Sequence, residues 1–149
     1  MTRALRVLIE NEAGSRIKNT FDERTFRLVQ TVAVSKPYPF PYGFIQNTRG
    51  GDGAALDCFV LSDYPLTSGQ QVSCYPRGLL EQIEDGQIDH KVIATLEDTS
   101  PIPGNVREVI AEFARGVFAH LPGKRMEIGR LLGSAEALNY VETFQLDTT

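Results

Sequence analysis

The chain has 149 residues, of which 42% are hydrophobic and 23% are charged, and these proportions are ordinary for a soluble globular protein. The length predicts a single domain, residues 1–149, that buries about 70% of its unfolded surface around one core. The net charge of −4 argues against a nucleic-acid-binding surface, which is normally basic. No apolar run is long enough to span a bilayer, and the N-terminal stretch lacks the features of a signal peptide. We therefore expect a cytoplasmic protein that binds neither nucleic acid nor membrane.

Short strand-like segments dominate the first two thirds of the chain. They are separated by turn residues and follow one another at short spacing, which predicts a β-barrel or a sandwich. The expected strands are residues 4–10, 16–21, 25–34, 42–45, 57–61, 70–75, 78–83 and 89–95, the last two forming a hairpin across residues 84–87. Cys58 and Cys74 lie in two of these apolar runs, where buried, reduced thiols are expected rather than a disulfide.

Two helices are expected after the strands. Residues 105–121 carry one apolar stripe, the mark of an amphipathic helix. Asn105 followed by Glu108 three residues later resembles a capping box at its start. A second, shorter helix is expected over residues 134–146, and both helices can cover the open side of a small barrel.

Residues 38–57 read YPFPYGFIQNTRGGDGAALD, and the rest of the chain is organised around them. Prolines make the entry to this stretch stiff and extended and exclude it from a central strand, whereas the glycines allow the backbone to bend and to approach a ligand. The loop presents Asp52 and Asp57 just before an apolar run. Taken alone, the stretch fits either carboxylates held around a cation or a surface hairpin with a solvated acidic tip.

Acidic residues recur beside structural breaks. Asp52 and Asp57 belong to the glycine-rich loop, while Glu84 and Asp89 belong to the hairpin that follows. Converging carboxylates repel one another unless a cation neutralises them, so convergence predicts Mg²⁺ or a similar hard ion.

Basic and phenolic side chains accompany these acids. Lys18 and Lys91 lie on expected strands from which they can reach phosphate oxygens, and Tyr38 and Tyr42 can donate to the same oxygens. No Ser-His-Asp pattern, phosphate-binding glycine loop, paired-cysteine motif or zinc-ligand spacing accompanies them.

Together, these motifs resemble those of the family I soluble inorganic pyrophosphatases. The segment YPFPYGFIQNT is similar to the family run Y-P-x-N-Y-G-[FY]-I-P-x-T, and DGAALDCFVL is similar to D-G-D-P-x-D with its apolar strand. The resemblance covers nearly the whole chain in order. It implies a mainly β fold with two helices, built as an OB-like, five-stranded, partly open barrel.

The resemblance also implies an enzyme and its site. The expected activity is Mg²⁺-dependent hydrolysis of pyrophosphate, with Mn²⁺ or a similar divalent ion as a substitute, by a chain that forms homo-oligomers. The implied metal ligands are Asp52, Asp57 and Asp89, with Glu84 and Glu10 in support. The implied catalytic residues are Asp57, Lys18, Tyr42 and Lys91, of which Lys18, Tyr42 and Lys91 also bind the substrate. Arg77 is the expected replacement for an arginine that the family carries elsewhere.

Several positions depart from the family pattern. Ala54 replaces the middle aspartate of the acidic loop, which in the family helps to activate the attacking water. A glutamate is replaced by Thr20 and an arginine by Gln30, and a Tyr-Lys pair on the long helix is replaced by Val117-Phe118. Loss of a general base typically costs about 10²- to 10⁴-fold in rate. Three readings follow: a weak pyrophosphatase, a hydrolase of another phosphorylated substrate, or a non-catalytic homologue that binds metal or phosphate.

Overall fold

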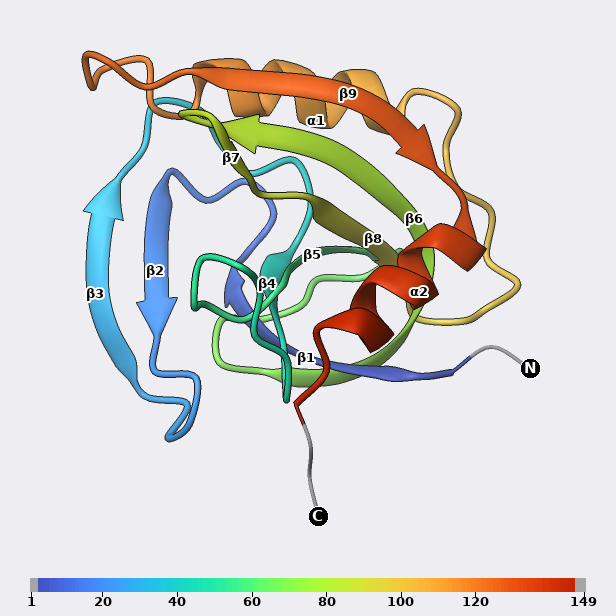
Figure 1. Cartoon of the computed structure of the whole chain (residues 1–149). Helices are drawn as coiled ribbons and strands as arrows, with labels where there is room; N and C mark the ends of the chain where they lie inside the picture. Colours follow the sequence, from blue (N-terminus) through green and yellow to red (C-terminus); the bar gives the residue numbers. More distant parts are fainter. Residues whose placement is uncertain (1–2, 147–149) are drawn as a thin grey trace.

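The computed structural model describes residues 3–146 (Figure 1). Within this range the chain forms strands and helices in the order β1 (Leu5–Asn11), β2 (Ile17–Phe21), β3 (Leu28–Ala33), β4 (Tyr42–Ile45), β5 (Asp57–Leu61), β6 (Gln71–Glu84), β7 (Gln87–Ile88), β8 (Lys91–Thr95), α1 (Val106–Gly116), β9 (Met126–Leu132) and α2 (Ser134–Thr143). Neither of these helices is long and apolar enough to cross a membrane.

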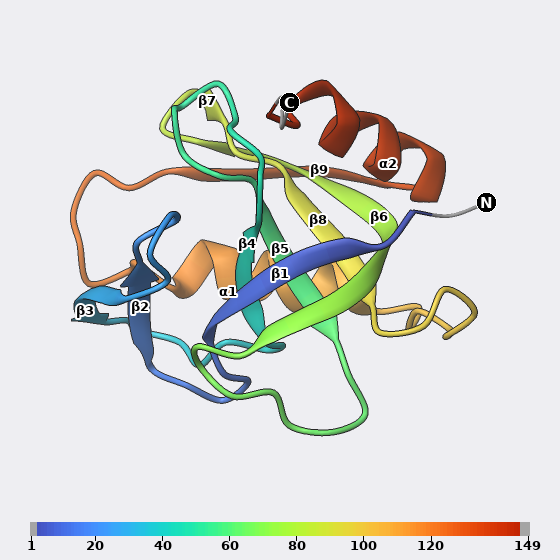
Figure 2. The same cartoon turned by 90° about the horizontal axis from the view of Figure 1, so that it is seen from below.

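Five strands close into a ring. The order is β1-β4-β5-β8-β6, and the first half of β6 returns to pair with β1. The β5–β8 pair is parallel, and the other pairs in the ring are antiparallel. Figure 2 shows these strands crossing one another around a common core. The mainly β architecture with two helices expected from the sequence is confirmed.

The long strand β6 was expected as two separate strands. Its first half closes the ring with β1, and its second half pairs with β8, β7 and β9. The expected hairpin turn is present, with Asp85 and Gly86 both at positive φ, 50° and 83°, as a two-residue turn between twisted strands requires. Strand β9 was not expected from the sequence. Its pairing with β6 bridges a sequence separation of more than 40 residues.

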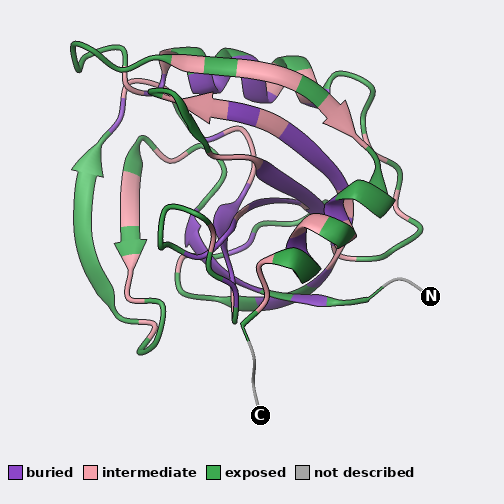
Figure 3. Cartoon of the chain, viewed as in Figure 1, coloured by how far each residue is buried: buried purple, intermediate pink, exposed green. Residues whose placement is uncertain are grey.

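The ribbon formed by β2 and β3 is separate from the ring (Figure 1). The expected strand 25–34 is shortened to Leu28–Ala33, and every residue of β3 is exposed, as Figure 3 shows. The expectation that this strand is covered on one side is therefore wrong. The apolar side chains of Leu28, Val29 and Val32 are instead exposed to solvent.

Helix α1 is shorter than the expected helix 105–121, because the regular helix ends at Gly116. The predicted capping box is absent: Asn105 makes no capping hydrogen bond, and the Glu108 carboxylate pairs with Arg107. Helix α2 likewise ends at Thr143 instead of near residue 146.

The core has two main parts, one on each side of the sheet. Val106, Ile110 and Phe113 of α1 pack against Phe59 and neighbouring ring residues, while α2 packs on the other part. Cys58 and Cys74 are buried free thiols, as expected. The helices thus bury the two apolar surfaces of the ring and leave a cavity beside α1.

Candidate active site

A cavity of about 280 Å³ lies between the ring, the β2–β3 ribbon, the glycine-rich loop and α1. All the site residues predicted from the sequence except Arg77 line it: Glu10, Lys18, Tyr42, Asp52, Asp57, Glu84, Asp89 and Lys91. These residues come from segments that are up to 81 positions apart in the chain. The fold therefore gathers the acidic loop, the acidic hairpin and both lysines around one space.

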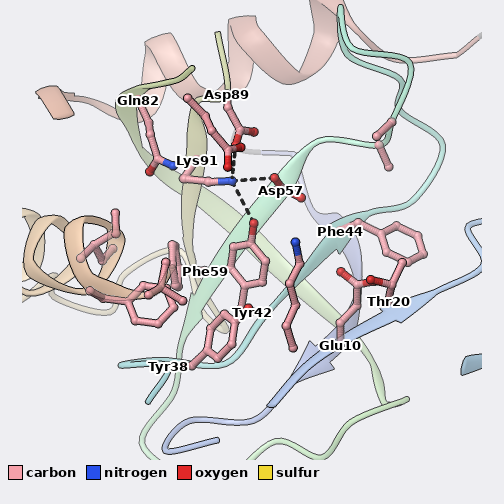
Figure 4. A pocket seen from close by; sticks show the side chains of 18 of the residues that line it. Glu10, Thr20, Tyr38, Tyr42, Phe44, Asp57, Phe59, Gln82, Asp89 and Lys91 are labelled. Carbon is pink, nitrogen blue, oxygen red and sulfur yellow. Dashed lines mark hydrogen bonds and ion pairs between the residues drawn. The ribbon is translucent and has the colours of Figure 1, made fainter. Parts of the chain in front are cut away.

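Lys91 is the centre of a buried ionic network (Figure 4). Its ammonium donates to Asp57 Oδ2 at 2.7 Å, to Asp89 Oδ2 at 3.0 Å and to the Tyr42 hydroxyl at 2.9 Å. The register of the ring explains the convergence. Asp57 and Lys91 are paired in the β5–β8 ladder, and Asp89, just before β8 begins, turns its carboxylate toward the Lys91 ammonium.

The network fixes the charge state of its members. Burial disfavours ionisation of Asp57, but the charge and hydrogen bond of Lys91 outweigh it and hold the pKa of Asp57 below its usual range. Burial raises the pKa of Asp89 to about 6, against the attraction of Lys91 and helped by the charge of Asp57. Burial would lower the pKa of Lys91, yet the two carboxylates raise it above its ordinary value. The raised pKa of Lys91 favours its ammonium form beside the two carboxylates.

Glu10 lies across the cavity from this network (Figure 4). Its Oε2 accepts the backbone N–H of Phe21 at 2.9 Å, which ties β1 to the β2–β3 ribbon. Burial raises the pKa of Glu10 to about 7. Lys18 lies on β2, and its ammonium is 5.3 Å from the centre of the Phe118 ring.

The glycine-rich loop presents Asp52 at the edge of the cavity. Asp52 Oδ1 accepts the backbone N–H of Ala54 at 3.0 Å, and Gly53 adopts a φ of 86° within the turn. The exposed Ala54 brings a methyl group to the cavity. The next backbone N–H, of Ala55, donates to Glu23 Oε2 at 3.0 Å.

Arg77 does not lie in the cavity, so its expected position beside the acidic hairpin is wrong. Its guanidinium donates to Thr95 Oγ1 and to the backbone carbonyl of Ser100. Arg77 and Glu84 are seven residues apart on the same strand, which separates them by about 20 Å along β6. A single strand that spans both ends of the barrel was not foreseen.

Other lining residues were not singled out from the sequence. Glu23 belongs to a charged turn between β2 and β3, and Gln82 lies on β6 between Leu80 and Glu84. Val117 and Phe118, which were identified from the sequence in place of a Tyr-Lys pair, also line the cavity and make this side apolar. Only the alternation along β6 could have indicated Gln82, and no sequence signal distinguished Glu23 from a solvated turn residue.

The cavity is strongly acidic. Two ammonium groups, of Lys18 and Lys91, and six carboxylates line it. The carboxylates are those of Glu10, Glu23, Asp52, Asp57, Glu84 and Asp89. Within residues 3–146, no three acidic, histidine or cysteine side chains are close enough to form a ready coordination group. The donor chemistry, all carboxylate oxygen, nevertheless fits a hard divalent cation such as Mg²⁺ and not a soft one.

The chain is similar in sequence to known proteins of one family. The family model for inorganic pyrophosphatase matches residues 7–145. The chain is 35% identical to the inorganic pyrophosphatase of Synechocystis sp. over 135 residues, which cover 83% of the chain and 79% of that protein. It is 32% identical to the inorganic pyrophosphatase of Streptomyces coelicolor over 148 residues, covering 91% and 90%.

Solved structures give the same result. The inorganic pyrophosphatase of Thermus thermophilus superposes with a TM-score of 0.85 at 27% identity, covering 95% of this chain and 88% of that one. The enzyme of Helicobacter pylori superposes equally well, with a TM-score of 0.85 at 25% identity, covering 95% and 91%. The chain belongs to the inorganic pyrophosphatase family.

Proposed function

We propose that the cavity hydrolyses the phosphoanhydride bond of inorganic pyrophosphate in the presence of a divalent cation. Family membership supports the reaction class, and the observation that carries the proposal is the network of Asp57, Asp89 and Tyr42 around the Lys91 ammonium. Water adds to one phosphorus as the bridging oxygen leaves with the other, and each product phosphate retains one of the two water protons.

Asp52, Asp57 and Asp89 are the proposed ligands of Mg²⁺, or of Mn²⁺ or a similar ion, with Glu10 and Glu84 in support. When bound, the cation would neutralise phosphate charge and polarise the phosphoryl group. An acidic cavity needs such compensation before it can accept a substrate anion, because carboxylates and phosphate oxygens repel one another.

The chain supplies its own groups for binding and orientation. Lys18 and Lys91 are the proposed cations for phosphate oxygens, and Tyr42 the proposed hydroxyl donor. Because phosphoryl transfer depends mainly on positioning and charge neutralisation, these groups support turnover even without a carboxylate base. The methyl group of Ala54 cannot accept a proton from water, so we propose a rate about 10²- to 10⁴-fold below that of a site with this base.

Phosphate release from pyrophosphate tests the proposal. The natural chain is compared with two variants, Ala54→Asp and Ala54→Asn, in Mg²⁺ and in EDTA. The asparagine has the shape of the aspartate but no basic carboxylate. We expect slow, EDTA-sensitive release by the natural chain and an increase of about 10²-fold or more in Ala54→Asp alone. Absence of release from all three proteins would refute the pyrophosphatase proposal and favour a non-catalytic metal- or phosphate-binding homologue.

The remaining parts of the proposal concern the whole protein. We propose one domain over residues 1–149 that acts in the cytoplasm on a small phosphate substrate, binds neither nucleic acid nor membrane, and forms homo-oligomers. The net charge of −4 supports the absence of nucleic-acid binding. Light scattering at several protein concentrations measures the oligomeric state.

A further inference from the structure

The α1 side of the cavity is apolar, which inorganic pyrophosphate does not require. Ile110, Phe113 and Val117 belong to the core cluster by which α1 packs on the ring and are at most 9% exposed. Phe118 and Met126, both half-buried, continue this apolar surface at the cavity and keep area that a ligand can contact. We call Phe118 and Met126 the apolar wall.

The apolar wall lies next to a proposed phosphate-binding group. The Lys18 ammonium is 5.3 Å from the centre of the Phe118 ring, and the Lys124 ammonium lies 5.4 Å from the same centre. Lys124 is oriented in turn by Glu84, at 3.3 Å. A phosphate held by Lys18 therefore lies within reach of the Phe118 ring, which both ammonium groups approach.

Pyrophosphate gains nothing from such a wall, because all its outer atoms are charged or polar oxygens. An apolar group attached to a phosphate gains the free energy of leaving water, which corresponds to about fourfold in affinity for each buried methylene. A cavity of about 280 Å³ is close to the lower end of the range that accepts small organic ligands.

We propose that the site takes diphosphate monoesters whose organic group is apolar, with that group on the apolar wall and the terminal phosphate among Lys18, Lys91 and Tyr42. This inference rests on the proposed function, since it uses the same phosphoanhydride chemistry. Water oxygen bonds to the terminal phosphorus, and the bridging oxygen leaves on the organic phosphate. The trianionic ester yields an organic phosphate dianion and dihydrogen phosphate, which carries both water protons.

The test compares n-butyl diphosphate with methyl diphosphate, which carries the same phosphates but three fewer methylenes. Binding is measured by titration calorimetry with and without Mg²⁺, and kcat/KM by phosphate release, with pyrophosphate assayed in parallel. We expect n-butyl diphosphate to bind about ten- to sixtyfold more tightly than the methyl ester.

Substitutions in the apolar wall test where the organic group lies. Phe118→Gln is expected to reduce the butyl-to-methyl ratio by about tenfold. Met126→Gln, a second half-buried wall position, should reduce the ratio even if the first variant folds poorly. Leu121→Gln is the matched control, because Leu121 is exposed and does not line the cavity; its ratio should equal that of the natural chain.

The outcomes separate this inference from the proposed function. Pyrophosphate hydrolysis with equal affinity for the butyl and methyl esters overturns the inference and leaves the proposed function standing. Tighter binding of the butyl ester without phosphate release from any substrate supports the inference on ligand class and overturns the proposed hydrolysis. A butyl preference that survives both wall substitutions overturns the placement of the organic group.

Discussion

Replacing Lys91 with methionine removes the ammonium from the centre of the site while keeping a side chain of similar length. Lys91 is 8% exposed, and its partners Asp57 and Asp89 are 27% and 20% exposed. Removing one member of a buried ion pair typically costs 3–5 kcal/mol. Because the carboxylates retain some contact with water, we expect the lower end, a loss of about 3 kcal/mol in the free energy of unfolding.

Urea and thermal unfolding in EDTA, followed by circular dichroism, measure this loss. For a protein of this size, about 3 kcal/mol corresponds to a decrease in Tm of roughly 6–12 °C. Lys36→Met is the control, because the pair of Lys36 with Glu112 is longer, at 3.7 Å, and well exposed, and we expect a change within about 1 kcal/mol.

A second substitution identifies the cause of the loss. Adding Asp57→Asn to Lys91→Met removes one of the two uncompensated carboxylates and should restore part of the stability. A loss below about 1 kcal/mol in Lys91→Met, or no recovery in the double variant, would refute the reasoning that the network holds two buried charges together.

Two further predictions concern the frame of the site. At Gly43, an added Cβ would lie 1.8 Å from the backbone oxygen of Leu8, so Gly43→Ala should lower the free energy of unfolding by more than about 3 kcal/mol or prevent folding. Gly51→Ala is the control, because its Cβ would meet nothing within 4 Å. In the same unfolding assay, Gly51→Ala should change the free energy of unfolding by less than about 0.5 kcal/mol. The hydrogen bonds and charge of Arg130 lower the pKa of Glu81 to about 2. The stability that this carboxylate contributes is therefore fully present above about pH 4.5 and is lost as pH falls through about 2. The difference in unfolding free energy between the natural chain and Glu81→Gln should shrink over that interval, and a difference that grows on acidification contradicts the prediction.

Much of the ring and of the acidic site could be predicted from the sequence, because both depend on local patterns. The segments Tyr42–Ile45 and Asp57–Leu61 are strands with the expected bounds, since short apolar runs flanked by turn residues favour strands. Along the expected strand 89–95, the alternation of side chains predicts Asp89 and Lys91 on one face, and the structure brings the two side chains together although the strand begins only at Lys91. Asp57 could be linked to them only through the family resemblance, because the parallel pairing that joins these strands connects distant segments.

Long-range pairing explains the predictions that were wrong. Residues 126–132 have no strong strand pattern, yet they form β9 because the second half of β6 offers an unpaired edge. The same long strand carries Arg77 away from the acidic hairpin, where its guanidinium donates to Thr95 and Ser100. Residues 126–132 and the long strand β6 are both present in the sequence, but local sequence patterns do not predict which strand edges pair with each other.

The sequence by itself determined the family, the five-stranded plan and the identities of the carboxylates and lysines, because those are encoded in short motifs and strand alternation. The tertiary structure alone decided that Lys91 is buried between Asp57 and Asp89 and that Phe118 and Met126 continue the apolar surface of α1 at the cavity. A helix stripe indicates which face is buried. Whether that face meets only the core or also a ligand depends on how the helix sits over the ring, which contacts between distant segments determine.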